Sequence, residues 1–239
     1  MIKLLVLDMA GTTVRDLNEV EYCFSEACKA TGLKVSNDTI KAIQGWSKIY
    51  VFQKLWKEQL GENHPELEIK IKHSFETFKN ILESYYQTHE IVPTVGAIEV
   101  FNFCKKNNIK VVLTTGFYRK VTDMILDRLG WLKGLNDQRI STSSDSIISA
   151  SISSDEVDHG RPSPDLVFKA MQLFNISDSK QVVVVGDTPS DLGCGKNAGA
   201  LLTIGVTNGT HSKELLEQHS HDLLLPSLTA LPDVLQKYI

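Results

Sequence analysis

Short apolar runs alternate with helical patterns along most of the chain. The apolar runs cover residues 2–7, 111–113, 147–152, 182–185 and 201–206, the third being the weakest. Apolar residues recur at helical spacing over residues 97–107, 120–129 and 164–174. Buried parallel strands are continuous apolar runs, and helices form the connections between them. The pattern therefore predicts an α/β fold with a doubly wound parallel sheet.

The segment between the first and second predicted strands is far longer than one crossover helix needs. Helical spacing recurs within it, over residues 18–31, 47–60 and 73–86. Ser47 is a typical helix N-cap residue. We expect residues 15–90 to form a small inserted helical domain, and residues 1–14 with 91–239 to form the α/β domain. An insert directly after the first strand is a candidate lid over the carboxyl edge of the sheet, where such sheets bind ligands.

Composition limits the classes of function. Hydrophobic residues make up 42% and charged residues 23% of the chain, as in ordinary globular proteins. There are 25 Lys and Arg residues against 29 Asp and Glu, whereas a nucleic-acid binder usually has a basic excess. No stretch approaches the length of a membrane span, and the four cysteines form no CxxC pair. We therefore expect a cytoplasmic protein with reduced thiols and no nucleic-acid or membrane partner.

Acidic residues directly follow two of the predicted strands. Asp8 ends the first strand, and Asp187 and Asp191 come after the run at 182–185. A single Asp in such a place is more often a turn or helix-cap residue. Buried acidic residues from two strand ends, however, are costly unless a cation lies nearby. We expect carboxylates from the two strand ends to be able to hold one Mg²⁺ ion in a hard oxygen cage.

Two further motifs offer groups that bind anions. Thr115 and Gly116 follow the second strand and supply a hydroxyl group and backbone N–H groups for phosphate oxygens. Arg161 precedes a predicted helix start at Pro164, where a fixed cation favours a bound anion. Alone, Arg161 would be read as a surface charge. The histidines near the C-terminus have no ligand partners in the sequence, and we expect a solvated surface at His211, His219 and His221.

These four motifs, in this order, resemble those of the haloacid dehalogenase superfamily over nearly the whole chain. The resemblance implies a Rossmann-like core with a helical cap and a Mg²⁺-dependent hydrolase activity. It implies that Asp8 is the nucleophile, which forms an aspartyl-phosphate, and that Thr115 binds the phosphoryl oxygens. Arg161 would offset the charge on the nucleophile and phosphate. The implied Mg²⁺ ligands are Asp8, the backbone carbonyl of Ala10, Asp187 and Asp191.

Ala10 departs from the phosphatases of this superfamily, which usually carry a second Asp there as acid and base. The phosphonoacetaldehyde hydrolase branch has alanine at this place, and its motifs are similar to Asp8-Met9-Ala10-Gly11-Thr12-Thr13, Thr114-Thr115-Gly116-Phe117 and Gly160-Arg161-Pro162. In that branch a cap lysine condenses with the substrate aldehyde. The matching string, Gly45-Trp46-Ser47-Lys48, puts Lys48 in its place. The start of a helix disfavours an ammonium group, and Schiff-base formation needs a neutral amine.

The resemblance implies a small phosphorylated or phosphonate substrate, a possible cap-to-cap homodimer, and substrate-binding residues Thr12, Gly45, Ser47, Lys48, Thr115 and Gly116. Lys48 is also compatible with a surface lysine or a simple substrate contact. Val51 stands where the phosphonoacetaldehyde hydrolase branch has a histidine, so a phosphomonoesterase of the phosphoglycolate phosphatase type remains an alternative. A metal-free dehalogenase is disfavoured by the paired Asp187 and Asp191. A non-catalytic binding protein is disfavoured because all the motif residues are present.

Overall fold

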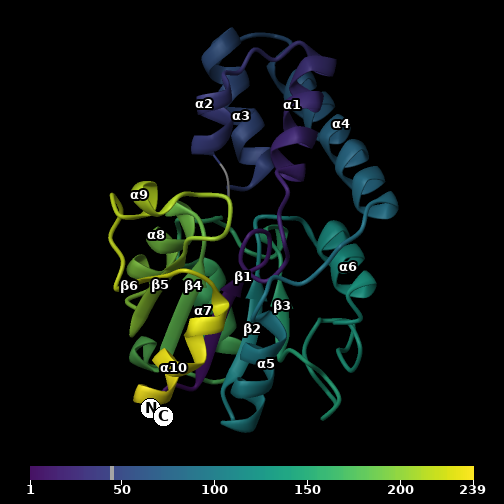
Figure 1. Ribbon diagram of the computed structural model, residues 1–239. Helices are drawn as coiled ribbons and strands as arrows, with labels where there is room; N and C mark the ends of the chain where they lie inside the picture. Colours follow the sequence, from purple (N-terminus) through teal and green to yellow (C-terminus); the bar gives the residue numbers. More distant parts are fainter. Residues whose placement is uncertain (44–45) are drawn as a thin grey trace. The chain divides into compact units, whose positions relative to one another are not determined.

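The computed structural model describes residues 1–43 and 46–239. The chain divides into two compact units (Figure 1). The α/β unit comprises Met1–Asp16 and Ile91–Ile239, and the helical unit comprises Leu17–Glu90.

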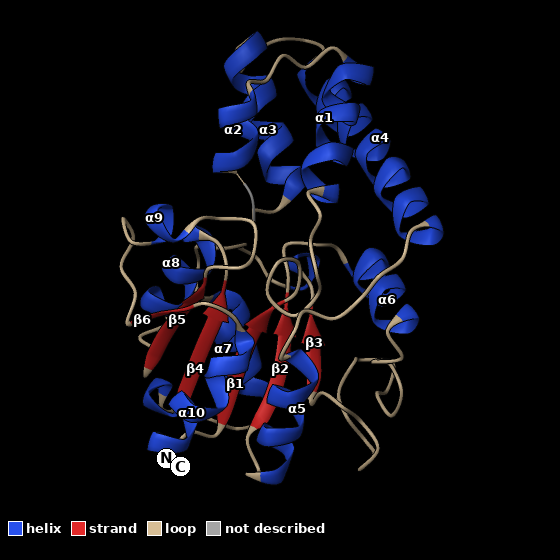
Figure 2. Cartoon of the chain, viewed as in Figure 1, coloured by secondary structure: helices blue, strands red, loops and turns tan. Residues whose placement is uncertain are grey.

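The described strands of the α/β unit form a six-stranded parallel sheet, with strand order β3-β2-β1-β4-β5-β6 (Figure 2). Their bounds are β1 Leu4–Asp8, β2 Lys110–Thr114, β3 Ala150–Ile152, β4 Val182–Gly186, β5 Leu202–Val206 and β6 Leu223–Leu225. The chain winds outward from β1 in both directions, which confirms the predicted doubly wound sheet. The edge strand β6 was not predicted, because three leucines among polar residues are too short a pattern.

The helices of the α/β unit precede, connect or follow the strands along the chain. They are α5 Ala97–Lys106, α6 Arg119–Arg128, α7 Asp165–Leu173, α8 Pro189–Asn197, α9 Lys213–Leu216 and α10 Leu231–Leu235. The first three match the predicted helices to within one residue at each end. Helix α8 was not predicted, because its sequence PSDLGCGKN contains two glycines and has little apolar periodicity.

The core of the α/β unit lies against the central strands. Leu4 and Val6 of β1 pack in one buried cluster with Leu166 and Ala170 of α7. Alternate residues of a strand point to opposite faces, so Leu5 and Leu7 face the other side of the sheet. β1 is buried along its whole length, which is why its sequence is a continuous apolar run.

The helical unit contains α1 Glu19–Thr31, α2 Asn37–Ala42, α3 Lys48–Leu60 and α4 Leu67–Thr88. Its core includes three phenylalanine rings: the Phe24 and Phe52 centroids lie 4.9 Å apart, and Phe78 lies 6.2 and 6.1 Å from them. Helix α4 begins six residues before the predicted 73, since the apolar positions Leu67 and Ile71 extend the same buried stripe. The short α2 was not predicted.

The two chain segments that connect the units run side by side within the α/β unit. Val14 pairs with Pro93 in an antiparallel bridge. The Arg15 N–H donates to the carbonyl of Val92 at 3.0 Å. The chain ends are also adjacent, since the N–H of Ile2 donates to the carbonyl of Tyr238 at 3.1 Å (Figure 1). They lie at the amino edge of the sheet, where β1 begins.

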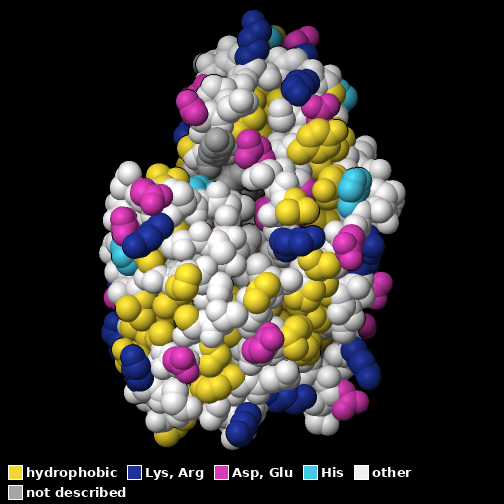
Figure 3. Space-filling view, viewed as in Figure 1, with side chains coloured by type: hydrophobic (Ala, Val, Ile, Leu, Met, Phe, Trp, Pro, Cys, Tyr) yellow, Lys and Arg dark blue, Asp and Glu magenta, His cyan; other side chains and the backbone are white. Residues whose placement is uncertain are grey.

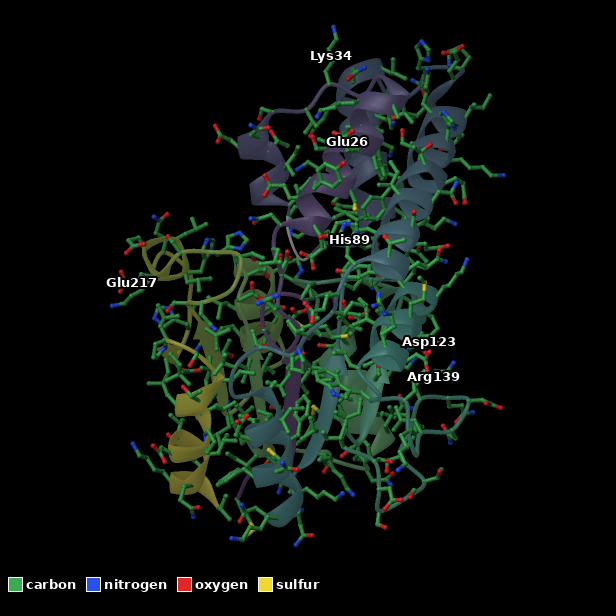
Figure 4. All side chains as sticks on the ribbon, turned by 45° about the vertical axis from the view of Figure 1, so that its right-hand side comes forward. Glu26, Lys34, His89, Asp123, Arg139 and Glu217 are labelled. Carbon is green, nitrogen blue, oxygen red and sulfur yellow. The ribbon has the colours of Figure 1, made fainter. Side chains whose placement is uncertain are left out.

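Lys and Arg side chains are interspersed with Asp and Glu over the face of the α/β unit drawn in Figure 3. One ion pair secures the long loop before β3: the guanidinium of Arg139 binds both carboxylate oxygens of Asp123, at 2.8 and 2.7 Å (Figure 4). Among the described residues, no helix is both long and apolar enough to span a membrane.

Candidate active site

The strand order places the candidate site at the carboxyl edge of the sheet, beside β1. β1 lies between β2 and β4, with Asp8 paired to Thr114 and Leu7 paired to Val185. The strand order reverses at β1, since β2 and β3 are added on one side and β4 to β6 on the other. Ligands of doubly wound sheets bind in the crevice at such a point. The strand ends therefore bring the motifs at Asp8, Thr114 and Asp187 to one place.

Three carboxylates meet at this edge. Asp8, Asp187 and Asp191 each offer an oxygen atom, and these atoms lie within 4.8 Å of one another. All three side chains are buried. The structure thus brings together the acidic residues that the sequence singled out.

Arg161 supplies the positive charge within the cluster. Its Nη1 pairs with Oδ1 of Asp8 and lies 2.7 Å from Oδ1 of Asp191, and its Nη2 donates to the Thr114 hydroxyl at 2.6 Å. Burial alone would lower the pKa of this guanidinium, but Asp191 and Asp8 raise it above its ordinary value. Arg161 is therefore a permanent cation that fixes two of the three carboxylates, not a surface charge.

Asp187 is held by donors from two loops. Oδ1 accepts from the Thr12 hydroxyl at 2.8 Å, while Oδ2 accepts from both the N–H and the hydroxyl of Thr210, at 2.8 and 2.7 Å. Glycines allow the close approach. A Cβ on Gly11, whose φ is +87°, would lie 2.2 Å from Oδ2, and a Cβ on Gly209 would lie 2.4 Å from the Cβ of Asp187.

Asp191 lies in the first turn of α8 and belongs to a capping box with Thr188. Its Oδ2 accepts from the N–H and the hydroxyl of Thr188, at 3.0 and 2.6 Å. Its buried Oδ1 makes no hydrogen bond with the described residues, although Nη1 of Arg161 is near. This oxygen, whose only charged neighbour at this distance among the described residues is Arg161, could also serve as a ligand for a hard cation.

The electrostatic balance of the cluster also fits a cation. Burial raises the pKa of Asp8 well above its ordinary value, against the lowering effect of Arg161, and the two other carboxylates add to the rise. Burial and Asp191 raise the pKa of Asp187 to about 6, although the hydrogen bonds from Thr210 and Thr12 lower it. Three buried carboxylates face one guanidinium, so a divalent cation would restore the balance.

Thr115 and Gly116 lie just beyond β2 and take part in the bonding of their own loop. Oγ1 of the buried Thr115 accepts from the N–H of Phe117 at 3.1 Å. The carbonyl of Gly116 accepts from the Ser154 hydroxyl at 2.9 Å. The preceding Thr114 is the residue that contacts Arg161.

Sequence reasoning missed the hydroxyl groups that hold the acidic residues, at Thr114, Thr188 and Thr210. Thr188 stands one residue after Asp187 and three before Asp191, so the capping-box spacing was a readable signal. Thr210 follows the end of another strand, β5, and that position was the available clue. The expectation of a solvated His211 was wrong: this residue is 6% exposed, and its Nδ1 lies 3.0 Å from the Thr210 hydroxyl oxygen.

The residues predicted on the inserted segment lie in the helical unit. Lys48 is the first residue of α3 and is buried. Its Nζ donates to the carbonyls of Ile43 and Trp46, at 3.3 and 3.4 Å, and lies 5.8 Å from the ring centroid of Phe24. Ser47 occupies the N-cap position, although its side chain makes no capping hydrogen bond there. Gly45 lies outside the described residues.

A sequence model of haloacid dehalogenase-like hydrolases matches residues 2–199. The chain therefore belongs to the haloacid dehalogenase-like hydrolase family, and it is a hydrolase, as the motifs indicated. It is similar to the phosphonoacetaldehyde hydrolase of Bacillus cytotoxicus, at 27% identity over 252 residues, covering 99% of this chain and 87% of the relative. It is also similar to that of Latilactobacillus sakei, at 29% identity over 216 residues, covering 86% and 75%.

Solved structures show the same fold. A hydrolase from Pseudomonas syringae has a TM-score of 0.80 and 19% identity, over 98% of each chain. A phosphonoacetaldehyde hydrolase like protein from Oleispira antarctica has a TM-score of 0.74 and 21% identity, over 99% of this chain and 92% of that chain.

Proposed function

We propose that this chain is a Mg²⁺-dependent hydrolase that releases phosphate from a small phosphonate, with Asp8 as the nucleophile. The observation that carries the proposal is the buried cluster of Asp8, Asp187 and Asp191 around Arg161 at the carboxyl edge of the sheet. The similarity to phosphonoacetaldehyde hydrolases and the alanine at position 10 favour phosphonoacetaldehyde itself as the first substrate to test.

The metal would be held by Asp8, Asp187, Asp191 and the backbone carbonyl of Ala10. Hard oxygen ligands suit Mg²⁺, and when bound it would offset the negative charge of the phosphoryl group and of the carboxylates. Arg161 contributes a second positive charge beside Asp8. Since Arg161 is already held by Asp8, Asp191 and Thr114, its charge needs little reorganisation as charge develops on the phosphoryl group.

In the proposed reaction, an oxygen of Asp8 bonds to phosphorus while the phosphorus–carbon bond breaks. The electron pair of that bond would pass into a protonated imine between the substrate aldehyde and Lys48, which becomes an enamine. Water then cleaves the aspartyl-phosphate to phosphate. The enamine carbon takes a proton from solvent, and hydrolysis of the resulting imine releases acetaldehyde and frees Lys48. No leaving oxygen has to be protonated in the first step, which accounts for Ala10.

The second candidate is a phosphomonoesterase of the phosphoglycolate phosphatase type. Val51, which stands where the phosphonoacetaldehyde hydrolase branch has a histidine, favours it, and Val51 is buried in α3. For a phosphate ester, a group other than Ala10 has to protonate the leaving oxygen. The homodimer stays a prediction in either case.

A borohydride trap tests the proposal. The protein is incubated with Mg²⁺ and phosphonoacetaldehyde, reduced, and examined by intact mass and peptide mapping. We expect an adduct on Lys48 and free phosphate in the unreduced sample. Lys48→Arg should abolish the adduct, whereas Lys54→Arg, an exposed position on the same helix, should keep it.

Other outcomes separate the parts of the proposal. Phosphate release without an adduct would refute Lys48 as the imine-forming residue. Neither phosphate nor adduct would refute the phosphonate substrate and point to phosphate monoesters. Asp8→Asn should retain the fold and lose turnover, and appreciable residual turnover would refute Asp8 as the nucleophile.

A further inference from the structure

The loop that follows β5 contacts the acid cluster at Thr210, next to Gly209. Both the N–H and the hydroxyl of Thr210 donate to one atom of the cluster, Oδ2 of Asp187. Gly209 permits this approach, since any Cβ there would overlap Asp187. The loop therefore fixes the carboxylate of Asp187 from the side opposite Thr12, which binds Oδ1.

The direction of these hydrogen bonds determines which ring nitrogen of His211 carries a proton. A threonine hydroxyl has one proton, and an ionised carboxylate can only accept. Since the Thr210 hydroxyl donates to Asp187, its oxygen can only accept from Nδ1 of His211, 3.0 Å away. Nδ1 must then carry a proton, which leaves Nε2 unprotonated in the neutral ring.

We propose that Thr210 and His211 act as a positioning pair for Asp187, in which His211 orients the Thr210 hydroxyl and Thr210 orients the carboxylate toward the metal. This inference rests on the proposed metal site. Partners that orient a metal ligand commonly change metal affinity by about 10- to 100-fold when they are removed. Thr210 and His211 would thus tune metal affinity while Asp8 performs the chemistry.

The affinity for Mn²⁺, measured by electron paramagnetic resonance, tests the first half of the pair. Thr210→Val removes the hydroxyl and keeps the shape of the side chain, so we expect Mn²⁺ to bind about tenfold more weakly. Thr210→Ser restores the hydroxyl and should bind within about twofold of the wild type. A Thr210→Val protein with wild-type affinity and an intact circular dichroism spectrum would overturn the proposal.

Two substitutions at His211 test the second half. His211→Asn places an amide N–H near the position of Nδ1 and should retain Mn²⁺ affinity, whereas His211→Phe removes the donor and should lower it several-fold. His219→Asn, at an exposed position, is the matched control. Equal affinities of the Asn and Phe variants would exclude the hydrogen-bonding role.

The protonation of the ring nitrogens of His211 tests the proposal without a bound metal. Nitrogen-15 chemical shifts of the metal-free protein at neutral pH should show a protonated Nδ1 and an unprotonated Nε2, and Thr210→Val should remove this preference. The opposite tautomer in the wild type would overturn the pair. A wild type that binds no Mn²⁺ would instead refute the proposed metal site, so the two failures are distinguishable.

Discussion

At the scale of single residues, the site depends on how one guanidinium is shared. Arg161 contacts Asp8, Asp191 and Thr114 at once, which a planar fork of N–H donors can do and a single ammonium group cannot. The side chain is buried, so its charge is poorly screened by water and acts strongly on both carboxylates.

Substitution of Arg161 should therefore affect turnover according to geometry as well as charge. We expect Arg161→Gln to lower kcat by about 100-fold or more, because it removes the fixed cation beside Asp8. Arg161→Lys should recover only part of the loss, since it cannot maintain all three contacts. Steady-state phosphate release measures both, with the exposed Arg128→Gln as control. Full activity of Arg161→Lys would show that charge alone suffices.

The buried acids should also give the metal-free protein an unusual response to pH. The pKa of Asp187 rises from 3.8 to about 6 on folding, and that of Asp8 also rises, so the folded state binds more protons than the unfolded state in this window. Stability falls with rising pH wherever that holds. In chelator, the free energy of unfolding should drop by on the order of 2 kcal/mol from pH 4 to pH 6.

Thermal or urea unfolding across that window measures this drop. Asp187→Asn removes one of the titrating groups and should flatten the profile, and Mg²⁺ should reverse the loss in the wild type alone. Stability that rises with pH between 4 and 6 would contradict the raised pKa values.

The sequence identified the charged residues of the site but not the groups that orient them. Asp8, Asp187 and Asp191 stand directly after apolar runs, so strand prediction alone brings them to one edge. Thr210 and His211 belong to a polar stretch, and their role depends on how closely the loop after β5 approaches Asp187. That distance is a property of tertiary packing, which no local pattern encodes.

At the scale of elements, the end of β4 determines where Asp191 lies. Gly186 is the last residue of the strand and pairs in register with Gly205 of β5. A Cβ on Gly186 would lie 2.2 Å from the Cβ of Asp191 and 2.3 Å from its Cγ. The turn from β4 into α8 is thus tight because the carboxylate is packed onto the strand end.

Gly186→Ala should displace Asp191, and its effect on metal affinity can be compared with its effect on stability. We expect a loss of about 1–3 kcal/mol in the free energy of unfolding, typical of overpacking, together with Mn²⁺ binding at least tenfold weaker. Urea unfolding and Mn²⁺ titration measure the two effects. Wild-type Mn²⁺ affinity would show that Asp191 can shift without cost to the metal site.

Elements with a strong apolar period were predicted well, whereas short or glycine-containing ones were not. β1, β2, β4 and β5 are buried on both faces, so their sequences consist mainly of apolar residues, and such runs can be recognised. Helix α8 has glycines where an amphipathic helix would have apolar residues, and β6 is only three residues long. Neither sequence can therefore be distinguished from that of a loop.

At the scale of the whole molecule, all the described acidic and cationic groups of the cluster belong to the α/β unit. The segments that leave and re-enter this unit are already hydrogen-bonded as an antiparallel pair at Arg15 and Val92. A short turn can close such a pair.

Deletion of residues 17–90, with a Gly-Ser link from Asp16 to Ile91, should therefore leave a folded α/β unit. We expect it to bind Mn²⁺ within about threefold of the full chain, because the carboxylates are retained, and to lose phosphate release from phosphonoacetaldehyde, because Lys48 is absent. Circular dichroism, Mn²⁺ titration and a phosphate assay measure the three properties. Loss of the near-ultraviolet signal would show that the α/β unit needs the helical unit to fold.

The hydrogen bond between Ile2 and Tyr238 has a practical consequence for attachment. Both ends of the chain emerge at the amino edge of the sheet, whereas the acid cluster occupies the carboxyl edge. A tag, a surface linker or a fused enzyme joined at either end would thus be attached about one strand length from the acid cluster. Immobilisation through either terminus should leave the acid cluster on the side of the α/β unit that faces away from the support.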